Sequence, residues 1–168
     1  MTEMHAGRFT ADHDGDIVVF LIGMRINKLR KIHKWFPTAR SMAPMLRELQ
    51  QHPELGLLGG HQFVSGRTVL LVQYWRSFED LERFARDADH PHLEAWRRFN
   101  RRVGTSGDVG IFHETYVVPA GNHETFYGNM PAFGLADATG LTEVARRGQT
   151  AAKRMGRTDE DTPAEPPA

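Results

Sequence analysis

The sequence predicts an α+β fold in which a four-stranded antiparallel sheet carries two helices on one face. The chain has 168 residues, of which 40% are apolar and 25% are charged, as in a soluble globular protein with one ordinary domain. Its apolar segments follow the order strand, helix, strand, tight turn, strand, helix, strand. This βαββαβ order consists of two βαβ halves, which place both helices on the same side of the sheet.

The first strand and helix are predicted from local patterns. Residues 16–26 are almost all apolar and rich in β-branched side chains, which indicates a strand buried on both faces. Apolar residues recur at spacings of three and four over residues 28–51, which predicts a helix. Because a proline inside a helix costs about 3 kcal/mol, we expect a short turn first, a helix that begins near Pro37 and a kink at Pro44.

The remaining elements of the pattern follow turn and capping residues. After a flexible link over residues 55–60, we expect a hairpin of residues 61–64 and 67–75 around Ser65-Gly66. Ser77 is a typical helix cap, and a second helical stretch is predicted from Pro91 to Gly104. Residues 107–118 form the final predicted strand.

The chain ends differ in composition from its centre. Residues 1–15 are expected to be a flexible N-terminal arm, and residues 16–141 the folded domain, with an ordered aromatic segment at residues 123–141. Residues 142–168 are rich in Arg, Ala, Thr, Glu and Pro, so they are predicted to be a disordered tail.

Composition excludes several classes of function. The 21 basic and 21 acidic residues balance, so net charge gives no reason to expect a nucleic-acid or membrane partner. The absence of cysteine excludes disulfides, thiolate metal sites and a cysteine nucleophile. No signal peptide is evident, and the longest apolar run, residues 17–24, is too short to span a bilayer. We therefore expect a cytoplasmic protein.

The predicted sheet has a face that its own helices cannot cover. The first strand is apolar at both alternating positions, and the later strands also carry large side chains on both sides. An uncovered face with Phe, Tyr, Ile and Val would be an association surface. We therefore expect this face to be covered either by a second subunit, which would make the protein a homodimer, or by the segment that follows the last strand.

The last predicted strand carries polar residues that need partners or a pocket. Strand alternation places His113 on one face, and Phe112, Glu114 and Tyr116 on the other. His113 is the candidate for proton transfer, with Tyr116 as a positioning group. The alternative is that His113 or Glu114 forms a buried structural pair, and which face lines the pocket stays open.

Two further groups of residues are candidates. Gln73 and Trp75 lie at the end of the third strand, where Trp75 is either a core residue or the wall of a substrate pocket. Arg25, at the end of the first strand, could hold an anionic or enolic substrate. His90 and His92 flank a helix start and could bind metal, but capping or solvent exposure explains them more readily. Trp96 follows on the apolar face of that helix, as a core residue or part of a site.

Several stretches together resemble the dimeric α+β barrel superfamily. They are YWRSFEDL at residues 74–81, DHPHLEAW at residues 89–96, GRFT at residues 7–10, KWFP at residues 34–37, VGIFHETY at residues 109–116 and YGNMPAFGL at residues 127–135. The superfamily includes antibiotic-biosynthesis-type monooxygenases, haem-degrading monooxygenases and haem-dependent aldoxime dehydratases. The last four of these stretches look more closely like a bacterial and fungal group within the superfamily, whose members are labelled monooxygenase-like or of unknown function.

The resemblance implies a ferredoxin-like subunit whose sheet packs against that of a partner, with a pocket between sheet and helices. It implies a monooxygenase-type oxidoreductase for a small aromatic or polyketide-like molecule, without a cofactor. Haem is the alternative, with His113, His92 or His90 as its ligand. The proximal histidine of haem-degrading members corresponds to a position near Trp96, which counts against haem. A third possibility is a non-catalytic protein that binds a small ligand.

Overall fold

The computed structural model describes residues 3–86, 101 and 104–162. The chain divides into two compact units, a core unit of Val18–Tyr116 and a terminal unit that combines Met1–Ile17 with Val117–Ala168. Within the residues described, no helix is both long enough and apolar enough to cross a membrane.

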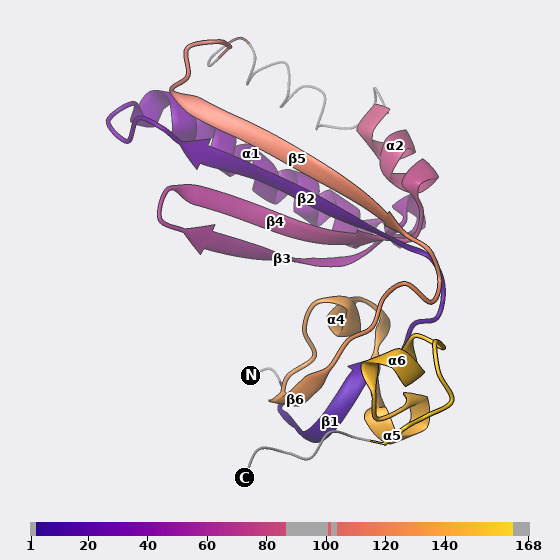
Figure 1. Ribbon diagram of the computed structural model, residues 1–168. Helices are drawn as coiled ribbons and strands as arrows, with labels where there is room; N and C mark the ends of the chain where they lie inside the picture. Colours follow the sequence, from indigo (N-terminus) through magenta and orange to yellow (C-terminus); the bar gives the residue numbers. More distant parts are fainter. Residues whose placement is uncertain (1–2, 87–100, 102–103, 163–168) are drawn as a thin grey trace. The chain divides into compact units, whose positions relative to one another are not determined.

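The core unit contains a four-stranded sheet with helices packed against it (Figure 1). The strand order is β3-β4-β2-β5, and β4 pairs antiparallel with both β2 and β3. This order confirms the predicted ferredoxin-like α+β fold. Its elements are β2 (Ile17–Ile26), α1 (Ile32–Gln51), the 3₁₀ turn η1 (Pro53–Leu55), β3 (Leu57–Ser65), β4 (Thr68–Trp75), α2 (Phe78–Arg86) and β5 (Val109–Val118). Most of the helical stretch predicted after Pro91 lies outside the described residues.

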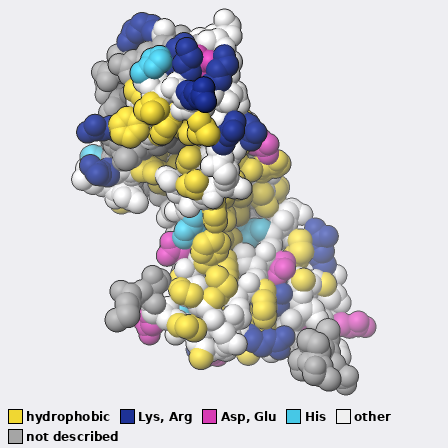
Figure 2. Space-filling view, turned by 90° about the vertical axis from the view of Figure 1, so that its left-hand side faces the viewer, with side chains coloured by type: hydrophobic (Ala, Val, Ile, Leu, Met, Phe, Trp, Pro, Cys, Tyr) yellow, Lys and Arg dark blue, Asp and Glu magenta, His cyan; other side chains and the backbone are white. Residues whose placement is uncertain are grey.

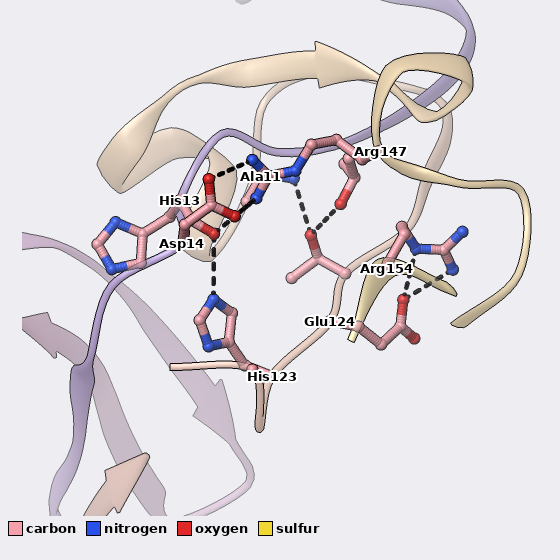
Figure 3. Close-up of a pocket in the computed structure, with 10 residues that line it drawn as sticks. Ala11, His13, Asp14, His123, Glu124, Arg147 and Arg154 are labelled. Carbon is pink, nitrogen blue, oxygen red and sulfur yellow. Dashed lines mark hydrogen bonds and ion pairs between the residues drawn. The ribbon is translucent and has the colours of Figure 1, made fainter. Parts of the chain in front are cut away.

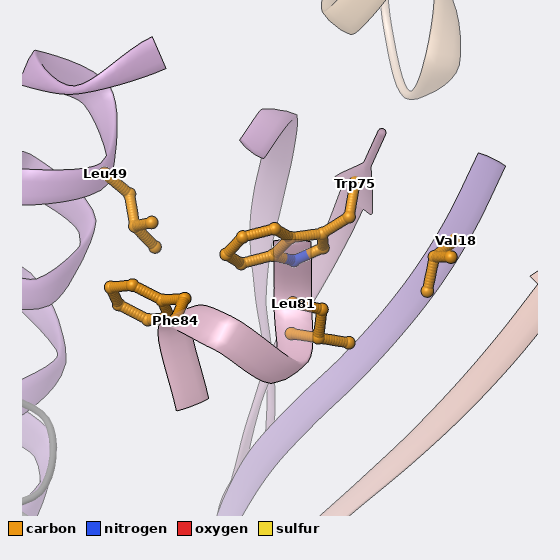
Figure 4. Packing of buried hydrophobic residues seen from close by; sticks show 5 residues of the cluster. All are labelled: Val18, Leu49, Trp75, Leu81 and Phe84. Carbon is orange, nitrogen blue, oxygen red and sulfur yellow. The ribbon is translucent and has the colours of Figure 1, made fainter. Parts of the chain in front are cut away.

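Two apolar clusters join the helices to one face of the sheet. In the first, the indole of Trp75 lies among Val18 of β2, Leu49 of α1, and Leu81 and Phe84 of α2 (Figure 4). The second cluster lies around Met24 of β2 and Val109 of β5, and Trp35 and Ala39 of α1 pack against it. These contacts identify the helix-facing side of each strand.

Helix α1 differs from the expectation of a helix that starts near Pro37. It begins five residues earlier, at Ile32, and continues past Pro37 and Pro44 to Gln51. The indole Nε1 of Trp35 donates to the carbonyl of Leu29 at 2.9 Å, which ties the first helical turn to the segment before it. Packing of the helix against the sheet on both sides of the prolines offsets the backbone hydrogen bonds that they remove.

The expected flexible link before the hairpin is largely part of β3. Gly59 and Gly60 pair with Tyr74 and Gln73 of β4, and the register shifts between Leu57 and Gly59. A Cβ on Gly60 would lie 2.6 Å from the carbonyl oxygen of Val72, so glycine permits the close approach of the two backbones. The turn that follows consists of Gly66 and Arg67, since Ser65 pairs with Thr68.

The terminal unit corrects the predictions of a flexible arm at residues 1–15 and a disordered tail at residues 142–168 for the parts that the structure describes, residues 3–15 and 142–162. Strand β1 forms the centre of a three-stranded sheet of order β6-β1-β7, so both ends of the chain enter one folded unit. Its buried apolar side chains come from both ends as well, which gives these segments a core that neither has alone. Its elements are β1 (His5–Ala11), β6 (Tyr127–Met130), α4 (Leu135–Thr139), β7 (Leu141–Glu143), α5 (Val144–Arg147) and α6 (Ala151–Arg154).

Candidate functional site

The predicted site residues of β5 lie on opposite faces of the core sheet. Val109 belongs to the cluster that packs on α1, so His113, four residues later, points to the helix-facing side. A Cβ on Gly23 of β2 would meet the ring of Phe112 at 2.6 Å, which places Phe112 on the other side. Strand alternation therefore puts Glu114 and Tyr116 with Phe112 on the open face of the sheet.

His113 is an exposed imidazole on the helix-facing side. Its ring centroid lies 5.8 Å from that of Phe20 on β2. Among the described residues, none forms a hydrogen bond or an ion pair with the His113 ring, so both ring nitrogens are available to a ligand. An imidazole beside an aromatic ring combines a proton-transfer group with a flat apolar surface.

Trp75 is a core residue rather than a pocket wall, which corrects one of the roles considered for it. Its relative exposure is 0%, and its indole Nε1 donates to the Oε1 of Gln73 at 3.0 Å. Gln73 is also buried on the helix-facing side of β4. Each side chain therefore satisfies the other inside the core, and this arrangement explains the polar residue at position 73 without a substrate.

The open face carries the other candidates. The hydroxyl of Tyr116 donates to Glu114 at 2.5 Å, and this hydrogen bond raises the pKa of the Tyr116 phenol. Arg25 of β2 lies on the same face and donates from Nη1 to the hydroxyl of Thr68 at 3.3 Å. The structure thus places Arg25 with Tyr116 on the face opposite His113. The remaining candidates, His90, His92 and Trp96, lie outside the described residues.

The charged end of the core sheet is fixed by a buried carboxylate. Asp108 forms ion pairs with Lys28 at 2.8 Å and with Lys34 at 3.1 Å. Hydrogen bonds from these two ammonium groups lower the pKa of Asp108 from 3.8 to about 2. Its backbone carbonyl also accepts from the amides of Asn27 and Lys28, so this residue ties the start of β5 to the segment between β2 and α1.

The terminal unit contains a polar pocket that the sequence analysis missed (Figure 3). Its empty volume, which includes solvent space outside the open mouth, is about 370 Å³. Arg147 donates from Nη1 to Asp14 at 2.6 Å, and Arg154 donates from Nη2 to Glu124 at 2.7 Å. The lining residues are Thr10, Ala11, His13, Asp14, Gly121, His123, Glu124, Thr125, Arg147 and Arg154.

The charges in this pocket neutralise one another. The backbone carbonyl of His13 accepts from the Nη2 of Arg147 at 2.9 Å and contacts the Nε2 of His123 at 3.3 Å. Because a carbonyl oxygen only accepts, Nε2 carries the proton of the His123 ring. The two arginines are thus occupied by carboxylates and carbonyls, and they hold the two chain ends together. The pocket was missed because both ends were predicted to be mobile.

No group of three or more His, Asp or Glu side chains in the described ranges has a geometry that could hold a metal ion.

Comparison with known proteins identifies the family. The model of the family described as "Monooxygenase af470-like" matches residues 17–135. The chain is 31% identical over 125 residues to a protein of Aspergillus fumigatus named monooxygenase af470. This match covers 68% of the chain and 43% of the fungal protein, so the chain spans less than half the length of this relative.

A solved structure shows the same fold. The crystal structure of an aldoxime dehydratase in complex with butyraldoxime superposes with a TM-score of 0.62 at 19% identity. The superposition covers 80% of the chain and 40% of the dehydratase. At this identity the match shows the fold alone. The family match, which extends over more than half of the residues, confirms the resemblance noted from the sequence, and the chain belongs to the monooxygenase af470-like family.

Proposed function

We propose that this protein is a monooxygenase-type oxidoreductase that acts without a cofactor on a small aromatic or polyketide-like molecule. The observation that carries the proposal is the exposed imidazole of His113, which bonds to no described residue and lies beside the ring of Phe20, in a chain of a monooxygenase-like family. Phe20 would lie against the flat part of the substrate, and His113 would remove a proton from it. The resulting anion is electron-rich enough to reduce oxygen.

The reaction balances without an external reductant. A CH₂ group activated by an adjacent phenol or carbonyl gives up one proton to His113, and the anion attacks O₂. One oxygen atom stays on that carbon as a carbonyl, and the other leaves as water with the two hydrogens of the CH₂ group. The substrate carbon therefore supplies all four electrons that reduce O₂. General base catalysis of this kind typically contributes about 10²- to 10⁴-fold in rate.

A histidine substitution tests the role of His113. Oxygen uptake is measured with a panel of phenols, hydroquinones and polyketide-like enols. His113→Gln should lower the rate on an active compound by about 10²-fold or more. The matched control is His61→Gln, because His61 lies on β3 opposite Val72, on the other face of the sheet. An unchanged rate in His113→Gln would remove His113 from the mechanism. Tight binding of a compound without oxygen uptake would favour a non-catalytic binder.

Haem is a second candidate, and the same histidine favours it. No described residue bonds the ring nitrogens of His113, and imidazole is a common ligand of haem iron, so His113 would be the residue that holds the group. Haem bound there would supply a redox centre for oxidation, or a Lewis acid for dehydration of an aldoxime. Protein incubated with hemin should then show a Soret band that His113→Ala abolishes and His61→Ala keeps. Failure to retain hemin would exclude this candidate.

We also propose that the open face of the core sheet packs against a second copy of the chain. Phe112 and Tyr116 are 37% and 50% exposed on this face. Val19, Leu21 and Val72 lie on the same face by strand register. Light scattering should give the mass of a dimer, and Leu21→Glu should shift it to a monomer. A monomeric wild-type protein would contradict this proposal.

A further inference from the structure

The balanced net charge conceals a strong separation of charge along the chain. Residues 17–47 contain seven of the 21 Lys and Arg residues and no Asp or Glu. Most of these cations lie in the short segment that joins β2 to α1 and in the first turns of α1. One end of the core unit is therefore strongly basic, although the whole chain has no net charge.

Large apolar side chains are exposed in the same segment. Leu29, Ile32 and Phe36 are 49%, 58% and 51% exposed. Ile32 and Phe36, four residues apart, lie on one side of α1, and Leu29 lies in the turn just before this helix. They lie beside the inward-facing Trp35 and Ala39, so α1 presents an apolar stripe to solvent as well as one to the sheet. Exposed apolar side chains of this size, grouped together, indicate an interaction surface.

Cations surround this apolar stripe. Arg30 and Lys31 are exposed within the segment, and no carboxylate of a described residue pairs with either. Arg67, from the turn between β3 and β4, donates to the backbone carbonyl of Asn27 at 3.4 Å and so adds its charge to this end. Lys28 pairs with Asp108 but keeps a side chain that is 59% exposed. Figure 2 shows this end of the core unit, where Lys and Arg side chains surround a hydrophobic area.

From this surface we infer that the protein binds peripherally to an anionic membrane. We define the basic end as Lys28, Leu29, Arg30, Lys31, Ile32, Phe36 and Arg67. Leu29, Ile32 and Phe36 would enter the boundary between headgroups and acyl chains, while the cations contact lipid phosphates. A nucleic acid would be attracted by the cations but has no comparable use for three exposed aliphatic and aromatic side chains. This inference goes beyond the proposed oxidation and is independent of it.

The inference replaces the expectation, drawn from net charge, that the protein has no membrane partner. The net charge of the protein governs its attraction to a membrane only at long range. Within a Debye length of the membrane, the attraction depends on the charge of the part of the protein surface that faces the lipids. Peripheral binding also requires no membrane-spanning helix.

Sedimentation with vesicles tests the inference on the full chain. The protein should sediment with phosphatidylcholine vesicles that contain about one-third phosphatidylserine, but not with pure phosphatidylcholine vesicles, and added salt should weaken the binding. Failure to sediment with the anionic vesicles at low salt would overturn the inference.

Paired variants separate the two contributions. Arg30→Gln with Lys31→Gln should weaken vesicle binding about 25-fold, because each cation near an anionic surface contributes roughly fivefold. Ile32→Gln with Phe36→Gln should weaken it by about tenfold or more at unchanged charge. Circular dichroism checks that both variants are folded, and the matched control is Arg86→Gln with Arg146→Gln, which removes two exposed cations outside the basic end.

The control should bind vesicles like the wild type. Equal loss of binding in the control would contradict a specific surface and indicate a general charge effect. Binding to a short DNA duplex is measured for the same variants. If the Ile32 and Phe36 variant still binds both the duplex and the vesicles as the wild type does, the membrane inference is overturned in favour of a nucleic acid.

Discussion

The indole Nε1 of Trp75 donates a hydrogen bond of 3.0 Å to the Oε1 of Gln73, two residues earlier on the same face of β4. Both side chains are buried, and the Trp75 ring lies 5.6 Å from that of Phe84, centroid to centroid. The apolar core of the core unit therefore contains a polar pair, Gln73 and Trp75, whose buried donor and acceptor bond to each other. Such a pair stabilises the fold only while both partners are present.

Removal of the acceptor should destabilise the core unit. Gln73→Leu would leave the indole N–H of Trp75 buried without a partner, at a cost of about 1–3 kcal/mol in the free energy of unfolding. Urea unfolding of Gln73→Leu, Trp75→Phe and the double variant gives the coupling energy between the two side chains. The double variant should be more stable than the sum of the single effects implies. Strictly additive effects would show that the hydrogen bond contributes nothing.

Gly56 should tolerate no side chain. Its φ is +95°, and a Cβ there would lie 2.5 Å from a carboxylate oxygen of Asp80, which is buried. Burial raises the pKa of Asp80, but the nearby Arg76 and Arg83 outweigh this effect and lower it overall, so the carboxylate is held in place as an ion. Gly56→Ala should therefore cost more than about 2 kcal/mol of unfolding free energy.

Gly66→Ala is the matched control for this prediction. Gly66 also has a positive φ, +55°, but no atom lies within 4 Å of the added Cβ. This variant should cost only about 1–2 kcal/mol, the backbone strain of an L-residue in the left-handed region. Equal midpoints of thermal unfolding for the two variants would show that the Asp80 contact does not matter.

The stability of the core unit should fall in acid because of Asp108. Lys28 and Lys34 lower the pKa of this carboxyl from 3.8 to about 2, so the ionised form favours the folded state. The contribution is complete above about pH 4 and is lost as the pH falls towards 2. Urea midpoints measured between pH 7 and pH 2.5 should therefore decline less steeply in Asp108→Asn than in the wild type. The exposed Asp159→Asn provides the control, and parallel curves for Asp108→Asn and wild type would contradict the assignment.

Tyr116 should stay protonated to higher pH than an ordinary tyrosine. The hydrogen bond to the Glu114 carboxylate raises the pKa of its phenol. The ultraviolet absorbance of tyrosinate, taken as the difference between wild type and Tyr116→Phe, isolates this titration from that of Tyr74 and Tyr127. Glu114→Gln should move the titration to lower pH, and an unmoved curve would show that the carboxylate does not hold the hydroxyl.

The parts of the fold that the sequence predicts well depend on local patterns. Strand β2 was predicted within one residue because its side chains are apolar at both alternating positions. The cap at Ser77 was also identified, since its hydroxyl accepts from the amide of Asp80 at 3.1 Å. The predicted start of α1 was wrong because packing of Trp35 and Leu49 against the sheet outweighs the cost of two prolines. Such packing leaves no pattern in the neighbouring sequence.

The terminal unit and the site depend on contacts between distant residues. His5 of β1 pairs with Met130 of β6, more than 120 residues later, so no window of sequence contains both strands. Alternation along β5 correctly separated His113 from Phe112, Glu114 and Tyr116. Which of the two faces lies towards the helices is known only from the packing of Val109 against α1 in the structure. For the same reason, the sequence could not show that Arg25 of β2 shares the face of Tyr116 rather than that of His113.

Isotope labelling tests the central proposal of monooxygenation most directly. Once a compound that supports oxygen uptake is known, the reaction is run under ¹⁸O₂ and the product is analysed by mass spectrometry. The account predicts that each product molecule carries one ¹⁸O atom and that the other ¹⁸O atom appears in water. No external reductant should be needed, because the substrate supplies the electrons. The rate should be strongly lowered in His113→Gln. A product that carries oxygen from the solvent, or no labelled oxygen at all, would contradict it.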